Sequence, residues 1–203
     1  MKTCGLLVML EAAPEHEAAV ERFLEHAMPM VRTESEALAW FAVRFRRYHY
    51  GIFDVFPDEA ARERHVHGPV AQALGERGPL FATAPVFHRV EILASKLPPD
   101  LPIEADRKGL LVRVTPHRGR AAELADFMRA TRSIVDKEPA TTAWFALRFE
   151  NGDLGFFDAF TDSRARRKHL MGKAPRELVK HFRLLGGIPR TTLLDVKAET
   201  FAA

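Results

Sequence analysis

The segment AWFAVRF at residues 39–45 recurs almost unchanged as AWFALRF at residues 143–149. Each copy is followed at the same distance by a second apolar run, GIFDVF at 51–56 and GFFDAF at 155–160. Both pairs have the strand-turn-strand pattern of a β-hairpin. The register continues outward, so that Gly5 corresponds to Gly109 and His65 to His169. The sequence is therefore a tandem duplication of one structural unit.

The duplication divides the chain of 203 residues into two units, which we place at residues 1–97 and 108–203. Residues 98–107 begin with PPDLP, and we expect them to form a proline-rich linker of limited flexibility. A hydrophobic content of 47% is sufficient for each unit to bury a core of its own.

Composition and charge argue against several classes of partner. The formal net charge is only +3, which gives no reason to expect nucleic acid. The basic segment RARRK at 164–168 has no aromatic stacking platform beside it, so we interpret it as a solvated helix face. The single cysteine, Cys4, cannot form an internal disulfide, which fits a reducing cytoplasm. The apolar run that ends at Glu11 is too short to span a membrane, and we therefore expect a cytoplasmic protein without a membrane partner.

The same order of elements is predicted in each half. Apolar runs at 5–10 and 109–114 predict strands, and apolar residues at helical spacing over 20–31 and 124–135 predict helices. Pro29 interrupts the first of these helices, where the second has Ser133, so we expect a kink or an early end in the first copy only. Asp58 and Asp162 are candidate N-caps of a second helix, and strands at 86–93 and 190–196 close the two units.

This β-α-β-β-α-β order is that of a ferredoxin-like unit, with four antiparallel strands and two helices on one face. The uncovered face of such a sheet needs a second layer, which the other copy can supply. We therefore predict an α+β fold of two ferredoxin-like units that form a pseudo-dimeric α/β barrel within one chain. The sequence leaves open whether two such chains pair further as a homodimer.

The turn of the second hairpin decides which side chains share a face of the sheet. Asn151 and Gly152 favour a two-residue type I′ loop, which would place Asp158 on the face of Phe145 and away from Arg148. A register shift by one residue would exchange these neighbours. The face of Asp158 relative to Arg148, and likewise of Asp54 relative to Arg44 in the first half, is therefore left open.

Two segments, TTAWFALRF at 141–149 and LGFFDAFTDSRARRKHLMG at 154–172, resemble the antibiotic biosynthesis monooxygenase family of dimeric α/β barrels. That family includes quinol monooxygenases and heme-degrading oxygenases, and its single-unit members form homodimers, so the resemblance implies a fused dimer. Phe56 and Phe160 stand where many members have a tryptophan. The first strand also lacks the asparagine that is typical of the heme-degrading branch. We therefore expect no cofactor, and heme is a disfavoured alternative.

His65 and His169 are the candidate catalytic residues. Both lie on a stripe of identical residues at i, i+4 and i+7, which we expect to face the sheet. A histidine in an apolar cavity can act as a general base near neutral pH. Deprotonating a hydroxyl of a hydroquinone or an anthrone gives an electron-rich anion that can donate to O2. The alternative is a core histidine that is satisfied by one hydrogen bond.

Four further pairs of residues are candidate substrate-binding groups. Each carboxylate interrupts an apolar strand and could orient the histidine, bind a substrate hydroxyl or serve as a structural link. The arginines could stabilise an oxyanion or pair at a strand end, and the aromatic residues could stack on a planar ligand or belong to the core. The pairs are Asp54 and Asp158, Arg44 and Arg148, Trp40 and Trp144, and Phe56 and Phe160.

A metal site is not expected, because His67, the second histidine of a His-x-His pair, is replaced by Met171 in the other copy. The resulting hypothesis is a cofactor-independent monooxygenase that oxidises a planar phenolic or quinol-type small molecule with O2. The alternative is a non-catalytic ligand-binding or structural protein of the same fold.

Overall fold

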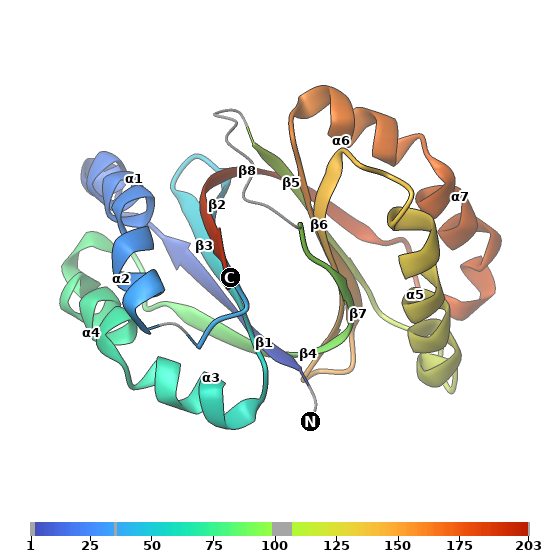
Figure 1. The fold of residues 1–203 in the computed structure, drawn as a ribbon, viewed down its shortest axis with the longest axis horizontal. Helices are drawn as coiled ribbons and strands as arrows, with labels where there is room; N and C mark the ends of the chain where they lie inside the picture. The colour runs from blue at the N-terminus through green and yellow to red at the C-terminus, as the bar shows by residue number, and fades with distance from the viewer. Residues whose placement is uncertain (1–2, 35, 99–106, 203) are drawn as a thin grey trace. The chain divides into compact units, whose positions relative to one another are not determined.

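The computed structural model describes residues 3–34, 36–98 and 107–202 (Figure 1). By its internal contacts the chain divides into two compact units. Unit 1 consists of residues 1–90 and 196–203, and unit 2 of residues 91–195. The last strand of each sequence repeat, at 86–96 and 190–201, therefore passes from one compact unit into the other. The linker expected at 98–107 lies outside the described residues except for Pro98 and Arg107.

Each repeat has the expected order of elements, with its second helical region divided in two. The first repeat contains β1 (Cys4–Glu11), η1 (Pro14–His16), α1 (Glu17–His26), α2 (Met28–Glu34), β2 (Ala39–Arg46), β3 (His49–Phe56), α3 (Glu59–Val66), α4 (Pro69–Glu76), η2 (Gly78–Leu80) and β4 (Val86–Lys96). The second repeat contains β5 (Lys108–Val114), α5 (Ala121–Val135), β6 (Thr141–Phe149), β7 (Leu154–Phe160), α6 (Ser163–Leu170), α7 (Lys173–Lys180), η3 (Phe182–Leu184) and β8 (Arg190–Phe201).

The strands are antiparallel, and the second strand of each hairpin is flanked on both sides. Strand β3 pairs with β1 and β2, and β7 pairs with β5 and β6. The hydrogen-bonded strand order is β1-β3-β2-β8-β5-β7-β6-β4, and within each unit the helices lie on one face of the sheet (Figure 1). The predicted α+β fold of two β-α-β-β-α-β units is confirmed.

The hairpin of unit 2 has a longer loop than the sequence predicts. The N–H of Phe149 donates to the carbonyl of Asp153 at 2.9 Å, and Gly152 adopts a left-handed φ of 86°. A three-residue loop that ends in a left-handed glycine replaces the expected two-residue turn. Asp158 consequently pairs with Trp144 and not with Phe145. The face of Asp158, which the sequence left open, is thereby settled as that of Trp144, because one extra loop residue exchanges the two faces.

Unit 1 reaches the same register by a different route. Arg46 pairs with His49, and the ladder is irregular between Arg44 and Arg46. The turn of unit 1 is shorter than that of unit 2, and the irregularity in β2 inserts one extra residue that compensates for the difference. Asp54 is therefore the partner of Trp40, as Asp158 is the partner of Trp144. In both units the strand carboxylate lies on the same face of the sheet as the tryptophan.

The face that carries the tryptophans packs against the helices. In unit 1 the cluster includes Trp40 and Tyr50 from the sheet and Val20 and Leu24 from α1. In unit 2 Trp144 belongs to a matching cluster that includes residues of α5. Burial of apolar area of this kind is the main source of stability. The candidate site residues Trp40, Trp144, Asp54 and Asp158 therefore all lie between a sheet and its helices.

Proline and glycine positions explain where the helices break. In the first repeat the helix ends at His26 and a second one starts at Met28, with Pro29 next to its start. The corresponding helix α5 runs without a break from Ala121 to Val135. The predicted interruption in the first copy only is confirmed. The break between α3 and α4, and between α6 and α7, occurs at Gly68 and Gly172, and it was not predicted.

The two predicted aspartate caps are confirmed. Asp58 accepts a hydrogen bond from the N–H of Ala61 at 2.8 Å, and Asp162 accepts one from Ala165 at 2.7 Å. A side-chain cap satisfies one of the backbone donors that the first turn of a helix leaves unpaired. No helix among the described residues is long and apolar enough to cross a membrane.

Removing the cap of α6 is expected to destabilise the protein moderately. Asp162→Ala should lower the free energy of unfolding by about 1 kcal/mol, measured by urea denaturation. Asp126→Ala is the matched control, since Asp126 is an exposed helical aspartate that forms a surface ion pair with Arg129, and such pairs contribute little. Equal losses in the two variants would contradict the capping role.

Candidate functional site

His169 lies in the last turn of α6 and is directed into unit 2. Its side chain is only 6% exposed, and its ring centroid lies 5.1 Å from that of Phe160. Helix α6 is held against the sheet by Arg166, which donates hydrogen bonds to the carbonyls of Gly109 and Leu194. The orientation of His169 therefore depends on a cap at one end of the helix and on an arginine anchor in its middle.

One ring nitrogen of His169 is held by a carboxylate. Nδ1 lies 2.6 Å from Oε2 of Glu138, and the hydroxyl of Thr141 donates to the same oxygen at 3.0 Å. Burial acts to lower the pKa of His169, but the hydrogen bond to Glu138 and the charge of Asp158 outweigh it, so that the pKa is raised. Burial acts to raise the pKa of Glu138, but the hydrogen bond to His169 lowers it overall. The pair therefore favours an imidazolium beside a carboxylate.

Asp158 is the second carboxylate near His169. It is 1% exposed, and its Oδ1 accepts no hydrogen bond from any described residue. Burial raises the pKa of Asp158 to about 7, although the positive charge of His169 opposes the shift. A carboxyl group in such surroundings exchanges its proton near neutral pH. Within the described residues no helix end or loop amide bonds Oδ1.

A cavity of about 210 Å³ opens at these groups. Its polar side chains are His169, Asp158, Thr131 and Thr191. The remaining wall is apolar and includes Leu110, Val112, Trp144, Phe156, Ala174 and Leu178. An apolar cavity with a few convergent polar and titratable groups is typical of a small-molecule site. In unit 2 the structure thus brings together three of the predicted site residues, His169, Asp158 and Trp144.

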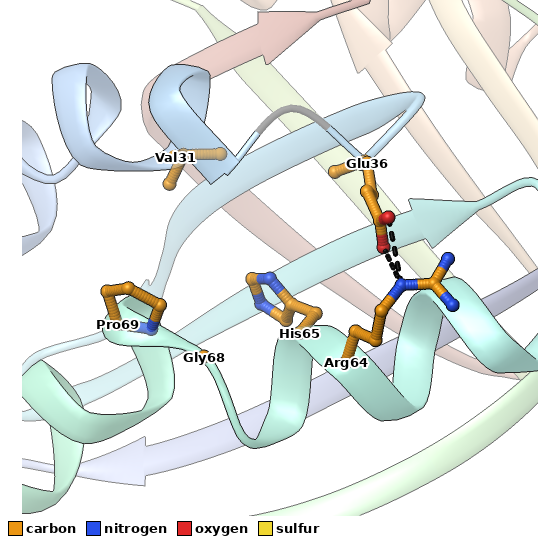
Figure 2. Close-up of a pocket in the computed structure, with 7 residues that line it drawn as sticks. Val31, Glu36, Arg64, His65, Gly68 and Pro69 are labelled. Atoms are coloured by element: carbon orange, nitrogen blue, oxygen red, sulfur yellow. Dashed lines mark hydrogen bonds and ion pairs between the residues drawn. The ribbon is translucent and has the colours of Figure 1, made fainter.

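The equivalent histidine of unit 1 has different surroundings. Nε2 of His65 lies 3.8 Å from Oδ2 of Asp54, and its ring centroid is 5.0 Å from that of Phe56. A pocket of about 230 Å³ is lined by His65 and by Glu36, whose two carboxylate oxygens accept a bifurcated hydrogen bond from Nε of Arg64 (Figure 2). Figure 2 shows the other lining residues, among them Val31, Gly68 and Pro69.

The two pockets therefore differ in what they bring to the histidine. Trp40 and Asp54 do not line the pocket of unit 1, whereas Trp144 and Asp158 line that of unit 2. One cause is visible in the sequence register, where Ala174 of unit 2 corresponds to Val70 of unit 1. Val70 is buried in the hydrophobic core, and Ala174 is part of the cavity wall. The larger side chain occupies space that stays open in unit 2.

The remaining predicted residues do not enter either cavity. Arg148 donates a hydrogen bond to Glu91 at 2.8 Å, and Arg44 lies 3.7 Å from a carboxylate oxygen of Glu21. These contacts agree with the interpretation of the arginines as paired residues near a strand end. Phe56 and Phe160 are fully buried, and their rings contact His65 and His169, respectively, without lining either cavity.

Sequence reasoning missed several residues of the site. Glu138 is one, and its equivalent in the first repeat is also a glutamate, Glu34, so comparison of the two copies could have found it. Arg62 and Arg166 are likewise identical in the two copies, and each donates to a carbonyl at the start of a strand. Ala174 gave no signal, because the size of a cavity depends on every side chain around it. Among the described residues, no cluster of histidine, cysteine and carboxylate side chains is arranged to hold a metal ion.

Comparison with known proteins places the fold. No protein-family model matches the chain, and no curated protein matches its sequence. A solved structure from Fusobacterium nucleatum is similar over 98% of this chain and 94% of its own, with a TM-score of 0.87 and 12% identity. One from Lactobacillus acidophilus covers 100% and 97%, with a TM-score of 0.83 and 12% identity. Both are described as a "putative monooxygenase".

A third structure carries the name of the family that the sequence resembles. It is an uncharacterised ferredoxin-fold protein from Listeria monocytogenes, described as related to antibiotic biosynthesis monooxygenases. The similarity covers 97% of this chain and 95% of that one, with a TM-score of 0.58 and 6% identity. At these identities the likeness concerns the fold alone. The chain has the fold of monooxygenase-like ferredoxin-fold proteins, in agreement with the resemblance found in the sequence.

Proposed function

We propose that the protein is a cofactor-independent monooxygenase that oxidises a planar phenolic or quinol-type small molecule with O2 in the cavity of unit 2. The observation that carries this proposal is the position of His169, a histidine tied to Glu138 at the wall of an apolar cavity that also contains Asp158. The structures of the same fold described as monooxygenases support the reaction class by analogy.

In this proposal Nε2 of His169 is the base. Glu138 holds Nδ1, and a carboxylate partner at one ring nitrogen favours the tautomer whose other nitrogen can accept a proton. The neutral ring takes the hydroxyl proton of the substrate, and the imidazolium that forms is stabilised by Glu138. The substrate phenolate is electron-rich and lies in an apolar site from which water is excluded.

The reaction needs no reductant other than the substrate. A phenol with a free para C–H reacts with O2 to give the para-quinone and water. One oxygen atom becomes the new carbonyl oxygen, and the other leaves as water with the hydroxyl and ring hydrogens. The electrons that the ring loses equal those that O2 gains, so no flavin or metal is required. His169 accepts a proton early in the reaction and returns it to the departing oxygen.

The test is the stoichiometry of O2 consumption with 1-naphthol as the probe substrate. An oxygen electrode and absorbance spectroscopy are expected to give equal amounts of O2 consumed and quinone formed from 1-naphthol, without hydrogen peroxide. Carrying out the reaction under ¹⁸O2 should place one labelled oxygen atom in the quinone. Release of hydrogen peroxide, or an unlabelled quinone, would contradict monooxygenation. Binding without O2 consumption would favour the alternative, a non-catalytic ligand-binding protein.

A further inference from the structure

The cavity of unit 2 is bordered by apolar side chains that are exposed to solvent. Val179 of α7 lines the cavity and is nevertheless 70% exposed. Ile188, which is 94% exposed, directly precedes the lining residue Pro189. Leu193 of β8 is 48% exposed and pairs with the lining residue Leu110. We call Val179, Ile188 and Leu193 the apolar rim.

Leu193 lies on the face of the sheet that contributes to the cavity. Across the β5–β8 ladder, Thr191 pairs with Val112 and Leu193 with Leu110. Because side chains alternate between faces along a strand, Leu193 shares the face of Thr191. Thr191, Val112 and Leu110 all line the cavity. The rim thus consists of a lining residue of α7, the residue next to the lining Pro189, and a residue of β8 on the same face as the lining Thr191.

The first repeat provides an internal comparison. The residues that correspond to Val179, Ile188 and Leu193 are Gly75, Ala84 and Arg89. Arg89 forms an ion pair with Glu63 at 3.0 Å. Only one repeat thus carries large apolar side chains at these positions, and in that repeat Trp144 and Asp158 line the cavity. Apolar side chains that gather at the mouth of a cavity mark a candidate surface for ligand contact.

Cavity size points to a ligand that extends beyond it. An apolar cavity of about 150 Å³ accommodates a benzene ring, so a cavity of about 210 Å³ has room for a substituted ring but for little more. Pockets that enclose a drug-sized ligand begin at about 300 Å³. A larger ligand must therefore leave the cavity past Val179 and lie on exposed surface.

We propose that the ligand of unit 2 is a phenol with an extended apolar substituent, whose ring occupies the cavity and whose substituent lies on the apolar rim. This inference rests on the proposed function for the identity of the ring, and it adds the chemical class of the remainder. The rim determines specificity by burying alkyl carbon atoms, while His169 and Asp158 contact the phenolic end.

The test is a series of 3-alkylphenols, from 3-methylphenol to 3-octylphenol, titrated by calorimetry under anaerobic conditions. These phenols keep the para C–H that the proposed oxidation requires. With the wild-type protein the affinity is expected to rise about twofold for each methylene group, since a methylene half-buried on the rim realises part of the full transfer free energy. The variant Ile188→Ser/Leu193→Ser, which leaves the lining residue Val179 in place, should bind 3-methylphenol as the wild type does, with an affinity that rises much less with chain length. The matched control is Val86→Ser/Phe87→Ser, which removes exposed apolar side chains of unit 1 and should leave the series unchanged.

The outcomes separate this inference from the proposed function. An unchanged chain-length dependence in the rim variant overturns the rim, even where phenols are bound and oxidised. The same holds if all ligands lose affinity equally, or if light scattering shows that the rim variant instead changes the oligomeric mass, which would make the rim a contact between copies of the chain. A chain-length dependence that needs the rim supports it even if no O2 is consumed, in which case only the catalytic proposal fails. Absence of binding by every phenol of the series overturns both.

Discussion

Replacement of His169 by alanine is expected to lower kcat for phenol oxidation by about 10²–10⁴-fold, the usual contribution of a general base. The variant loses the group that removes the hydroxyl proton, while the apolar wall that binds the ring remains. Initial rates of O2 consumption, together with calorimetric binding of 3-methylphenol, measure the two effects separately. The control is His67→Ala, which removes an exposed histidine at the end of α3 and should retain the wild-type rate.

The contribution of unit 1 is resolved in the same assay. If both units act, the double variant His65→Ala/His169→Ala should lose the activity that remains in His169→Ala. Wild-type rates in His169→Ala with folded protein, verified by circular dichroism, would refute the assignment of the base. Because His169 packs against Phe160, His169→Gln is a second variant that retains more of the side-chain volume.

Glu138 is a positioning residue in this scheme, and the pH profile of kcat/KM reports on it. The neutral form of His169 is the base, and its pKa is raised above 6.5 in the wild type, so activity should increase with pH through that raised value. Glu138→Gln removes the negative charge and should shift the profile to lower pH. A merely structural role of Glu138 would lower the rate without moving the profile.

Asp158→Asn is expected to make the protein relatively more stable as the pH rises. The carboxyl of Asp158 has a pKa of about 7 in the folded protein and an ordinary value of 3.8. Its contribution to stability is therefore fully present below 3.8 and is lost as the pH rises towards 7. Between pH 5 and pH 8 the wild type should lose about 3 kcal/mol that the asparagine variant retains. Urea denaturation of both proteins at several pH values measures the difference.

His169 and Glu138 also contribute to the pH dependence of the free energy of unfolding. Most of their contribution cancels when the wild type is compared with Asp158→Asn. The raised pKa of His169 also stabilises the fold at low pH, and this contribution is lost as the pH rises through the folded value. The lowered pKa of Glu138 acts in the opposite sense, because its stabilisation is present above 4.5 and is lost as the pH falls. Asp126→Asn, at an exposed position of α5, is the control and should show no pH-dependent difference. A constant difference between Asp158→Asn and the wild type would mean that Asp158 does not titrate in this range.

Several features of the fold could be predicted because they depend on local patterns. The order of strands and helices follows from hydrophobic periodicity, and the interruption of the first helix follows from Pro29, which lacks a backbone donor. Asp58 and Asp162 are caps because a short carboxylate before a helix reaches the N–H of the third residue. The inward direction of His65 and His169 followed from comparing the two copies, in which the exposed positions of the helix differ and the stripe that faces the sheet is identical.

The site was predicted less completely, because it depends on register and on distant neighbours. The choice between a two-residue and a three-residue loop at Gly152 exchanges the faces of a whole strand, and the Asn-Gly pair alone does not decide it. Glu138 lies 31 residues before His169 in sequence, and no local pattern links the two.

The sequence by itself determined the duplication, the order of the elements and the choice of His65 and His169 as candidate catalytic residues. Each of these depends on residues that are close together in the sequence or repeated in its two halves. Tertiary structure alone decided that Asp158 lies beside Trp144, that Glu138 holds His169, and that Trp144 and Asp158 line a cavity in unit 2. The physical reason is that hydrogen-bond register and packed volume are collective properties. One loop residue moves every side chain of a strand to the other face. Ala174 is smaller than Val70, its counterpart in the first repeat, and the space that it leaves is not predicted by any neighbouring residue in the sequence.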